Sequence, residues 1–92
     1  PNYKTKLFLK DEYVSSIINK NTVYLFSVDS KIQTLLSYYL PSSMVIDDFG
    51  EINKYKYVIT SNNNSLDKFD LNQYFIPVKK FDNLFLLMNI SN

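Results

Sequence analysis

TVYLFSVDSKIQTLLSYYLPSSMVIDD, residues Thr22 to Asp48, is the stretch that decides the fold. Its first part, Thr22–Val28, is uncharged and rich in β-branched and aromatic residues, a pattern typical of a central strand buried on both faces. Lys31–Leu40 then repeats apolar residues at helical spacing, and Pro41 ends that helix because proline cannot continue one. Met44–Ile46 is a second short apolar segment. A buried strand, a helix and another buried strand predict two parallel strands joined by a crossover helix.

The flanking segments extend this α/β pattern in both directions. Upstream, Tyr3–Leu9 mixes Lys with apolar residues and is predicted to be an edge strand, whereas Asp11–Asn19 has the N-cap and the spacing of a short helix. Downstream, a strand is predicted at Tyr55–Thr60, a loop at Ser61–Ser65 and a helical turn at Leu66–Asn72. Two further strands, Tyr74–Lys79 and Leu84–Ile90, are separated by a hairpin turn at Phe81-Asp82-Asn83. The sequence therefore predicts a small three-layer, Rossmann-like α/β domain with a partly parallel sheet and a C-terminal antiparallel strand pair.

Composition limits the chemistry that the chain can perform. It has 92 residues, a net charge of +1, no Cys and no His, and all of its cationic side chains are lysines. The lack of Cys and His excludes a zinc finger, a thiol nucleophile, a Ser-His-Asp triad and a disulfide framework. A balanced charge without Arg argues against nucleic-acid binding. No apolar run is long enough to cross a bilayer, and the start at Pro1 suggests one soluble domain, residues 1–92, excised from a larger protein.

Two strand ends supply candidate binding residues. Asp29 and Ser30 stand where the first buried strand meets a helix N-terminus, a place that binds ligands in open α/β sheets, although both residues also suit plain helix caps. Asp47 and Asp48 follow the second buried strand and could hold Mg²⁺ or act as acid and base. Solvated turn carboxylates are the alternative. The acidic pair resembles that of response-regulator receiver domains, but no Asp ends the strand that follows.

Three other features have two interpretations each. Tyr38 could contact sugars or a partner, or pack at the edge of the core. The interleaved Lys and aromatic residues of Tyr3–Lys6 and Lys54–Tyr57 could bind single-stranded nucleic acid or an anionic membrane, or guard strand edges. Asn63-Asn64-Ser65 and Asn89-Ile90-Ser91 are N-glycosylation triplets of the kind that arise by chance in an Asn-rich chain. We assign no catalytic residue, no metal site and no cofactor.

Parts of the chain resemble a known family. Val23-Tyr24-Leu25-Phe26, Leu35-Leu36-Ser37-Tyr38-Tyr39-Leu40 and Met44-Val45-Ile46-Asp47 are similar to a strand, a helix end and a second strand in one group of membrane enzymes. These are the GT-C type polyprenyl-phosphate-dependent membrane glycosyltransferases, related to aminoarabinose transferases and protein O-mannosyltransferases, and the pattern lies in their extracytoplasmic C-terminal regions. Tyr57–Ser61 and Phe85–Ile90 resemble later strands of the same regions. Pro41 stands where the family usually has Gly, so the turn after the helix departs from the pattern.

The resemblance implies a non-catalytic periplasmic domain of a bacterial inner-membrane glycosyltransferase. Such an enzyme transfers a sugar from a polyprenyl-phosphate carrier to a lipid, glycan or protein, and its catalytic acidic residue lies in a membrane block that this chain does not include. The implied partners are the transmembrane part of the parent chain and a lipid-linked sugar or acceptor glycan. Two alternatives stay open: a free-standing receiver-like regulatory or interaction module, and a sugar-binding module whose tyrosines stack on sugars.

Overall fold

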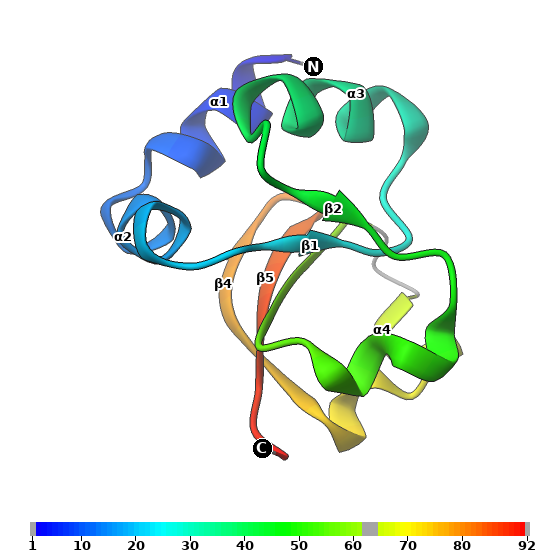
Figure 1. Cartoon of the computed structure of the whole chain (residues 1–92). Helices are drawn as coiled ribbons and strands as arrows, with labels where there is room; N and C mark the ends of the chain where they lie inside the picture. The colour runs from blue at the N-terminus through cyan, green and yellow to red at the C-terminus, as the bar shows by residue number, and fades with distance from the viewer. Residues whose placement is uncertain (1, 62–64, 92) are drawn as a thin grey trace.

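The protein forms a five-stranded mixed sheet with helices (Figure 1), seen in a computed structural model that describes residues 2–61 and 65–91. The strand order across the sheet is β2-β1-β3-β5-β4. β1 pairs in parallel with β2 on one side and β3 on the other, whereas β5 runs antiparallel to both β3 and β4. The bounds of the strands are β1 Tyr24–Leu25, β2 Met44–Val45, β3 Tyr57–Thr60, β4 Phe75–Phe81 and β5 Leu84–Asn89.

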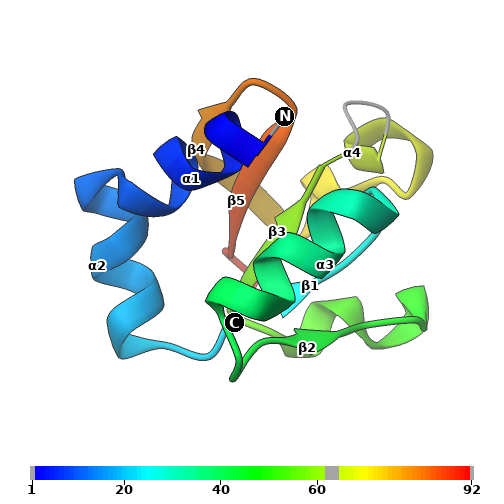
Figure 2. The same ribbon diagram turned by 90° about the horizontal axis from the view of Figure 1, so that it is seen from above.

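Helical segments lie on both faces of this sheet (Figures 1 and 2). The three longer helices share one face, and the short helical turns share the other. The longer helices are α1 Asn2–Lys10, α2 Glu12–Lys20 and α3 Ser30–Tyr39. The short segments are the 3-10 helix η1 Phe49–Lys54, the single turn α4 Ser65–Lys68 and the 3-10 helix η2 Leu71–Gln73.

The alternation of side chains along β5 explains why the core has two halves. Successive residues of a strand point to opposite faces of the sheet. Leu84 and Leu86 therefore join the cluster under the longer helices, whereas Phe85 and Leu87 join the cluster under the short ones. All four side chains are buried, so β5 reads as a continuous apolar run.

Several predictions are confirmed. α2 and α3 form over the predicted segments, and Asp11 caps α2 by accepting hydrogen bonds from the backbone N–H groups of Tyr13 and Val14. β1 and β2 are parallel, and β4 and β5 form the predicted antiparallel hairpin. The mixed α/β class is therefore as predicted. Residues 62–64 of the predicted loop, and with them Asn63 and Asn64 of the triplet Asn63-Asn64-Ser65, lie outside the described residues.

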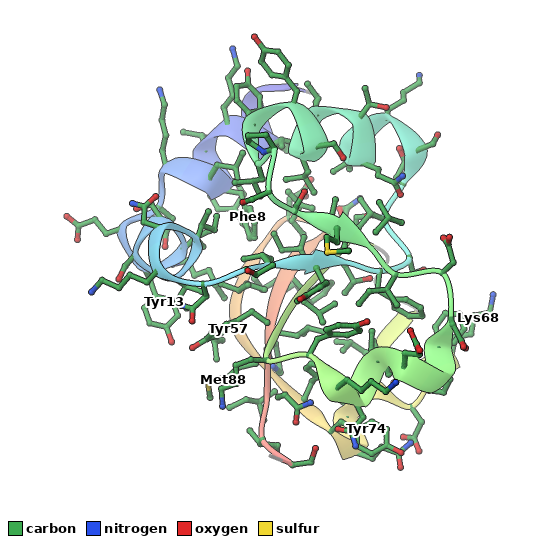
Figure 3. All side chains as sticks on the ribbon, in the orientation of Figure 1. Phe8, Tyr13, Tyr57, Lys68, Tyr74 and Met88 are labelled. Atoms are coloured by element: carbon green, nitrogen blue, oxygen red, sulfur yellow. The ribbon has the colours of Figure 1, made fainter. Side chains whose placement is uncertain are left out.

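The prediction of an edge strand over Tyr3–Leu9 is wrong, because this segment belongs to α1. Thr5 and Phe8 are both buried, at 1% and 0% exposure, and both face the core, as Figure 3 shows for Phe8 beneath α1. A spacing of three residues puts two side chains on the same side of a helix but on opposite faces of a strand. The exposed Lys4 and Lys6 thus guard no strand edge.

The second strand differs from its prediction in burial. Met44–Ile46 is predicted to be buried, but β2 is an edge strand of the sheet, and Met44 and Val45 are 59% and 45% exposed. Ile46 alone of the three is buried. β1 is central as predicted, although its regular pairing is confined to Tyr24 and Leu25. The pairing ends there because Ser27 turns out of the strand with φ of 53°.

Candidate functional site

The turn that follows β1 is held against the buried end of β3. Ser27 adopts the left-handed conformation, which costs a residue with a Cβ about 1 kcal/mol. The hydroxyl of Thr60 donates a hydrogen bond to the carbonyl oxygen of Ser27 at 3.4 Å. The backbone N–H of Asp29 donates to Ser61 Oγ at 2.6 Å. Because Thr60 and Ser61 are buried, this pair of contacts fixes the path of the chain from β1 into α3.

Asp29 is the N-cap of α3, and Ser30 is the first residue of that helix. One carboxylate oxygen of Asp29 accepts a hydrogen bond from the backbone N–H of Lys31 at 3.1 Å. Asp29 lines a hollow of about 370 Å³ together with Lys4, Lys31 and Asp82, and Lys4 and Asp82 form an ion pair at 3.2 Å. With two lysines and two carboxylates, this hollow has no charge preference.

Asp47 and Asp48 follow β2, as predicted, but they have different surroundings. Asp48 caps η1, because one of its carboxylate oxygens accepts a hydrogen bond from the backbone N–H of Gly50 at 2.8 Å. A Cβ on Gly50 would lie 3.1 Å from that oxygen, so a glycine suits this close approach. Asp47 is exposed, and within the described part of the chain its carboxylate has no hydrogen bond or ion pair.

A cavity of about 320 Å³ lies beside Asp47, between the β1–α3 turn, the end of β2, the start of η1 and the turn that follows α4. Three phenylalanine rings pack together along it, with ring centroids of Phe26 and Phe69 5.1 Å apart and those of Phe49 and Phe69 5.4 Å apart. Gln33 adds an amide group to the lining. Asp29 and Asp48 are absent from this lining, so the structure does not bring the predicted carboxylates into one site.

Tyr38 lies away from these strand ends. It is near the C-terminal end of α3, whereas Asp29 caps the opposite end of the same helix. Its side chain is 78% exposed, and its ring meets that of Tyr39 edge-on at 5.2 Å between centroids. Helical spacing puts Tyr39 on the buried stripe of this helix and Tyr38 off it, and Tyr38 is indeed exposed, whereas Tyr39 is covered only in part, at 39% exposure.

Asn89 belongs to the framework of the protein. Its side chain is fully buried, and its amide nitrogen donates hydrogen bonds to the carbonyl oxygens of Asn53 and Tyr55, each at 3.0 Å. Its amide oxygen accepts from the backbone N–H of Ser91 at 2.8 Å. In the folded domain this amide is inaccessible, so the triplet Asn89-Ile90-Ser91 offers no modification site.

The arrangement at the strand ends suits binding better than chemistry. Across residues 2–61 and 65–91, no three Asp, Glu, His or Cys side chains come together as a metal site would require. The cavity beside Asp47 holds one carboxylate, one amide and aromatic rings. This set can contact a ligand with an apolar surface and a hydrogen-bond donor.

Sequence analysis misses two structural features near the candidate residues. The first is the Thr60-Ser61 contact with the β1–α3 turn, for which two hydroxyls directly after the apolar strand are a possible signal. The second is a groove of about 460 Å³ between α1, α2 and the end of α3. Sequence analysis misses this groove because α1, which lines one side of it, is predicted to be a strand.

Comparisons of the chain with known protein families, with curated proteins and with solved structures find no match. Among the described residues, no helix is long and apolar enough to span a bilayer.

Proposed function

We propose that the chain is a non-catalytic, extracytoplasmic domain of a bacterial membrane glycosyltransferase. The parent enzyme transfers a sugar from a polyprenyl-phosphate carrier to a lipid, glycan or protein acceptor at the periplasmic face of the inner membrane. The domain caps the membrane active site, and its partners are the transmembrane part of the same chain and the lipid-linked sugar or the acceptor.

The observation that carries this proposal is the joint placement of the segments that resemble the family. They supply β1, the C-terminal end of α3 and β2, in the order strand, helix and parallel strand. The two later segments supply β3 and β5, which pair with each other in the same sheet.

The finer fold assignment belongs to the same proposal. We assign the domain to a reduced Rossmann-like arrangement with three layers. Its support is the parallel order β2-β1-β3 together with apolar clusters on both faces of the sheet. The antiparallel hairpin of β4 and β5 then extends the parallel half beyond β3.

The proposal is tested by reading the gene upstream of Pro1. We expect several consecutive apolar segments of about 20 residues, with an acidic residue in the first outer loop. A start codon directly before Pro1, or a soluble enzyme domain in place of the membrane block, would contradict the proposal.

The non-catalytic role has a separate test. The purified chain is incubated with a lipid-linked sugar donor and acceptors, and the parent enzyme serves as the positive control. We expect transfer by the parent and none by the chain alone. Turnover by the chain would show that it carries a catalytic set of its own.

A further inference from the structure

The face formed by α1 and α3 is basic. α1 contains Lys4, Lys6 and Lys10, α3 contains Lys31, and neither helix contains Asp or Glu. Lys4 is paired with Asp82. Across the described residues, the other three lysines form no ion pair, and all three are exposed. Lys31 shares the hollow at the N-terminus of α3 with Asp29, so the positive charge without a carboxylate in the same hollow comes from Lys6 and Lys10.

The opposite side of the sheet has the opposite charge. The segments around η1, α4 and η2 carry five carboxylates and fewer cations, with Lys54 paired to Glu51 at 3.3 Å and Lys68 far from α1 and α3 (Figure 3). The five carboxylates belong to Asp47, Asp48, Glu51, Asp67 and Asp70. A net charge of only +1 therefore conceals a separation of charge across the sheet.

The groove between α1, α2 and α3 opens on the basic side. Its lining combines the half-buried Leu9, Ile18 and Leu40 with the exposed Lys6 and Lys10, and it includes no carboxylate. Apolar side chains next to two lysines match the chemistry of an amphiphile with an anionic head group. A small soluble anion would leave the apolar part of the groove unused.

An exposed aromatic residue stands beside this groove. Tyr39 lines the groove, and Tyr38, with its ring against that of Tyr39, is 78% exposed. Tyrosine side chains are favoured at membrane surfaces, because the ring is apolar and the hydroxyl stays hydrated. Figure 2 looks down on this face, with α1 and α3 in front of the sheet.

We propose that the α1–α3 face docks on a bilayer that contains anionic phospholipid. The phosphate of one lipid lies near Lys6 and Lys10, and the upper part of its acyl chain lies along Leu9, Ile18 and Leu40 in the groove. Tyr38 anchors the face at the level of the head groups. This proposal goes beyond the proposed function and needs no particular sequence upstream of the chain.

The test is cosedimentation of the purified chain with sucrose-loaded vesicles at low ionic strength. We expect binding to vesicles of phosphatidylcholine mixed with phosphatidylglycerol, weak binding to phosphatidylcholine alone, and release by salt. The double variant Lys6→Gln, Lys10→Gln should bind more weakly by about fivefold for each lysine removed. Tyr38→Ser should also weaken binding, with an unchanged circular dichroism spectrum because the side chain is exposed.

The matched control is the double variant Lys54→Gln, Lys68→Gln, which removes the same charge from the opposite side. It should bind anionic vesicles as the native chain does. Equal loss in this control, equal binding to neutral vesicles, or no binding to anionic vesicles would overturn the proposal. So would chemical shift changes at Lys6 and Lys10 with glycerol 3-phosphate as large as those with anionic bicelles, since these would indicate a small-anion site.

These outcomes are independent of the proposed function. The vesicle experiment uses only the chain and lipid, whereas the transferase proposal depends on the upstream gene and on sugar transfer. A negative result in the vesicle experiment would therefore not affect the transferase proposal, and a negative result for the transferase proposal would not affect the docking proposal.

Discussion

The buried amide of Asn89 should be one of the most sensitive positions in the domain. Its nitrogen has three acceptors within reach, two on Asn53 and one on Tyr55, but only two hydrogens to share among them. Its oxygen accepts from the backbone of Ser91. Asn89→Ala removes about three hydrogen bonds of about 1 kcal/mol each, so the loss is about 3 kcal/mol.

This loss is large relative to the stability of so small a domain. At about 0.1 kcal/mol per residue, the free energy of unfolding is about 9 kcal/mol, so the variant should lose about a third of it. Urea unfolding followed by circular dichroism should show a lower midpoint with an unchanged slope, and the melting temperature should fall by about 15 °C. The matched control is Asn72→Ala, because Asn72 is exposed on η2. A loss below about 1 kcal/mol for Asn89→Ala would refute the assigned role of this network.

Three further predictions concern other parts of the framework. Ser61→Ala removes the acceptor of the Asp29 N–H and should lower the free energy of unfolding by about 1 kcal/mol in urea titrations. Leu36→Ala empties a fully buried position and should cost about 2–5 kcal/mol in the same assay. The pKa of Asp11 lies below its usual value of 3.8, because its carboxylate accepts hydrogen bonds from the backbone N–H of Val14 and from the side chain of Lys79. The stability that Asp11 contributes is therefore present above pH 3.8 and is lost as the pH falls through the lowered pKa, and Lys79→Gln should raise that pKa in an NMR titration.

Each of these predictions has a control and a contrary result. Ser37→Ala, at an exposed position of α3, should leave stability unchanged, and equal losses for the two serine variants would contradict the role of Ser61. Leu7→Ala, at a residue 38% exposed, should cost much less than Leu36→Ala. Lys54→Gln, which is remote from Asp11, should leave the pKa of Asp11 unchanged. A pKa of Asp11 at or above 3.8 in the native chain would contradict the assigned hydrogen bonds.

The sequence predicts those elements whose signals are local. The helices after Asp11 and Asp29 have a cap and an amphipathic repeat, and the hairpin of β4 and β5 has a short polar turn between two apolar runs. Tyr3–Leu9 is mispredicted because, over only seven residues, the spacing of the apolar side chains is compatible with both a strand and a helix. The helix forms because Phe8 of α1 packs into the core, a tertiary contact that the local sequence pattern does not contain.

The candidate site is less predictable than the fold. Asp29 and Asp47 do follow neighbouring strands, but α3 and η1 leave the sheet on opposite faces, so the two side chains line separate hollows. The burial of Met44 and Val45 is mispredicted because a short apolar strand looks the same at the centre and at the edge of a sheet. The groove beside Lys6 and Lys10 requires three helices to be placed together before it exists.

The mixed strand order also determines how the protein assembles itself. β4 and β5 are joined by a tight turn, so they can pair with little loss of chain entropy, on a timescale of about 1–10 μs for a hairpin. The other pairings close longer loops, because β1 and β2 pair residues 20 apart in the sequence, β3 and β5 residues 25 to 31 apart, and β1 and β3 residues 34 apart. The hairpin is therefore the most local pairing of the sheet, whereas the exposed edge strand β2 is held in the sheet by its pairing with β1 alone.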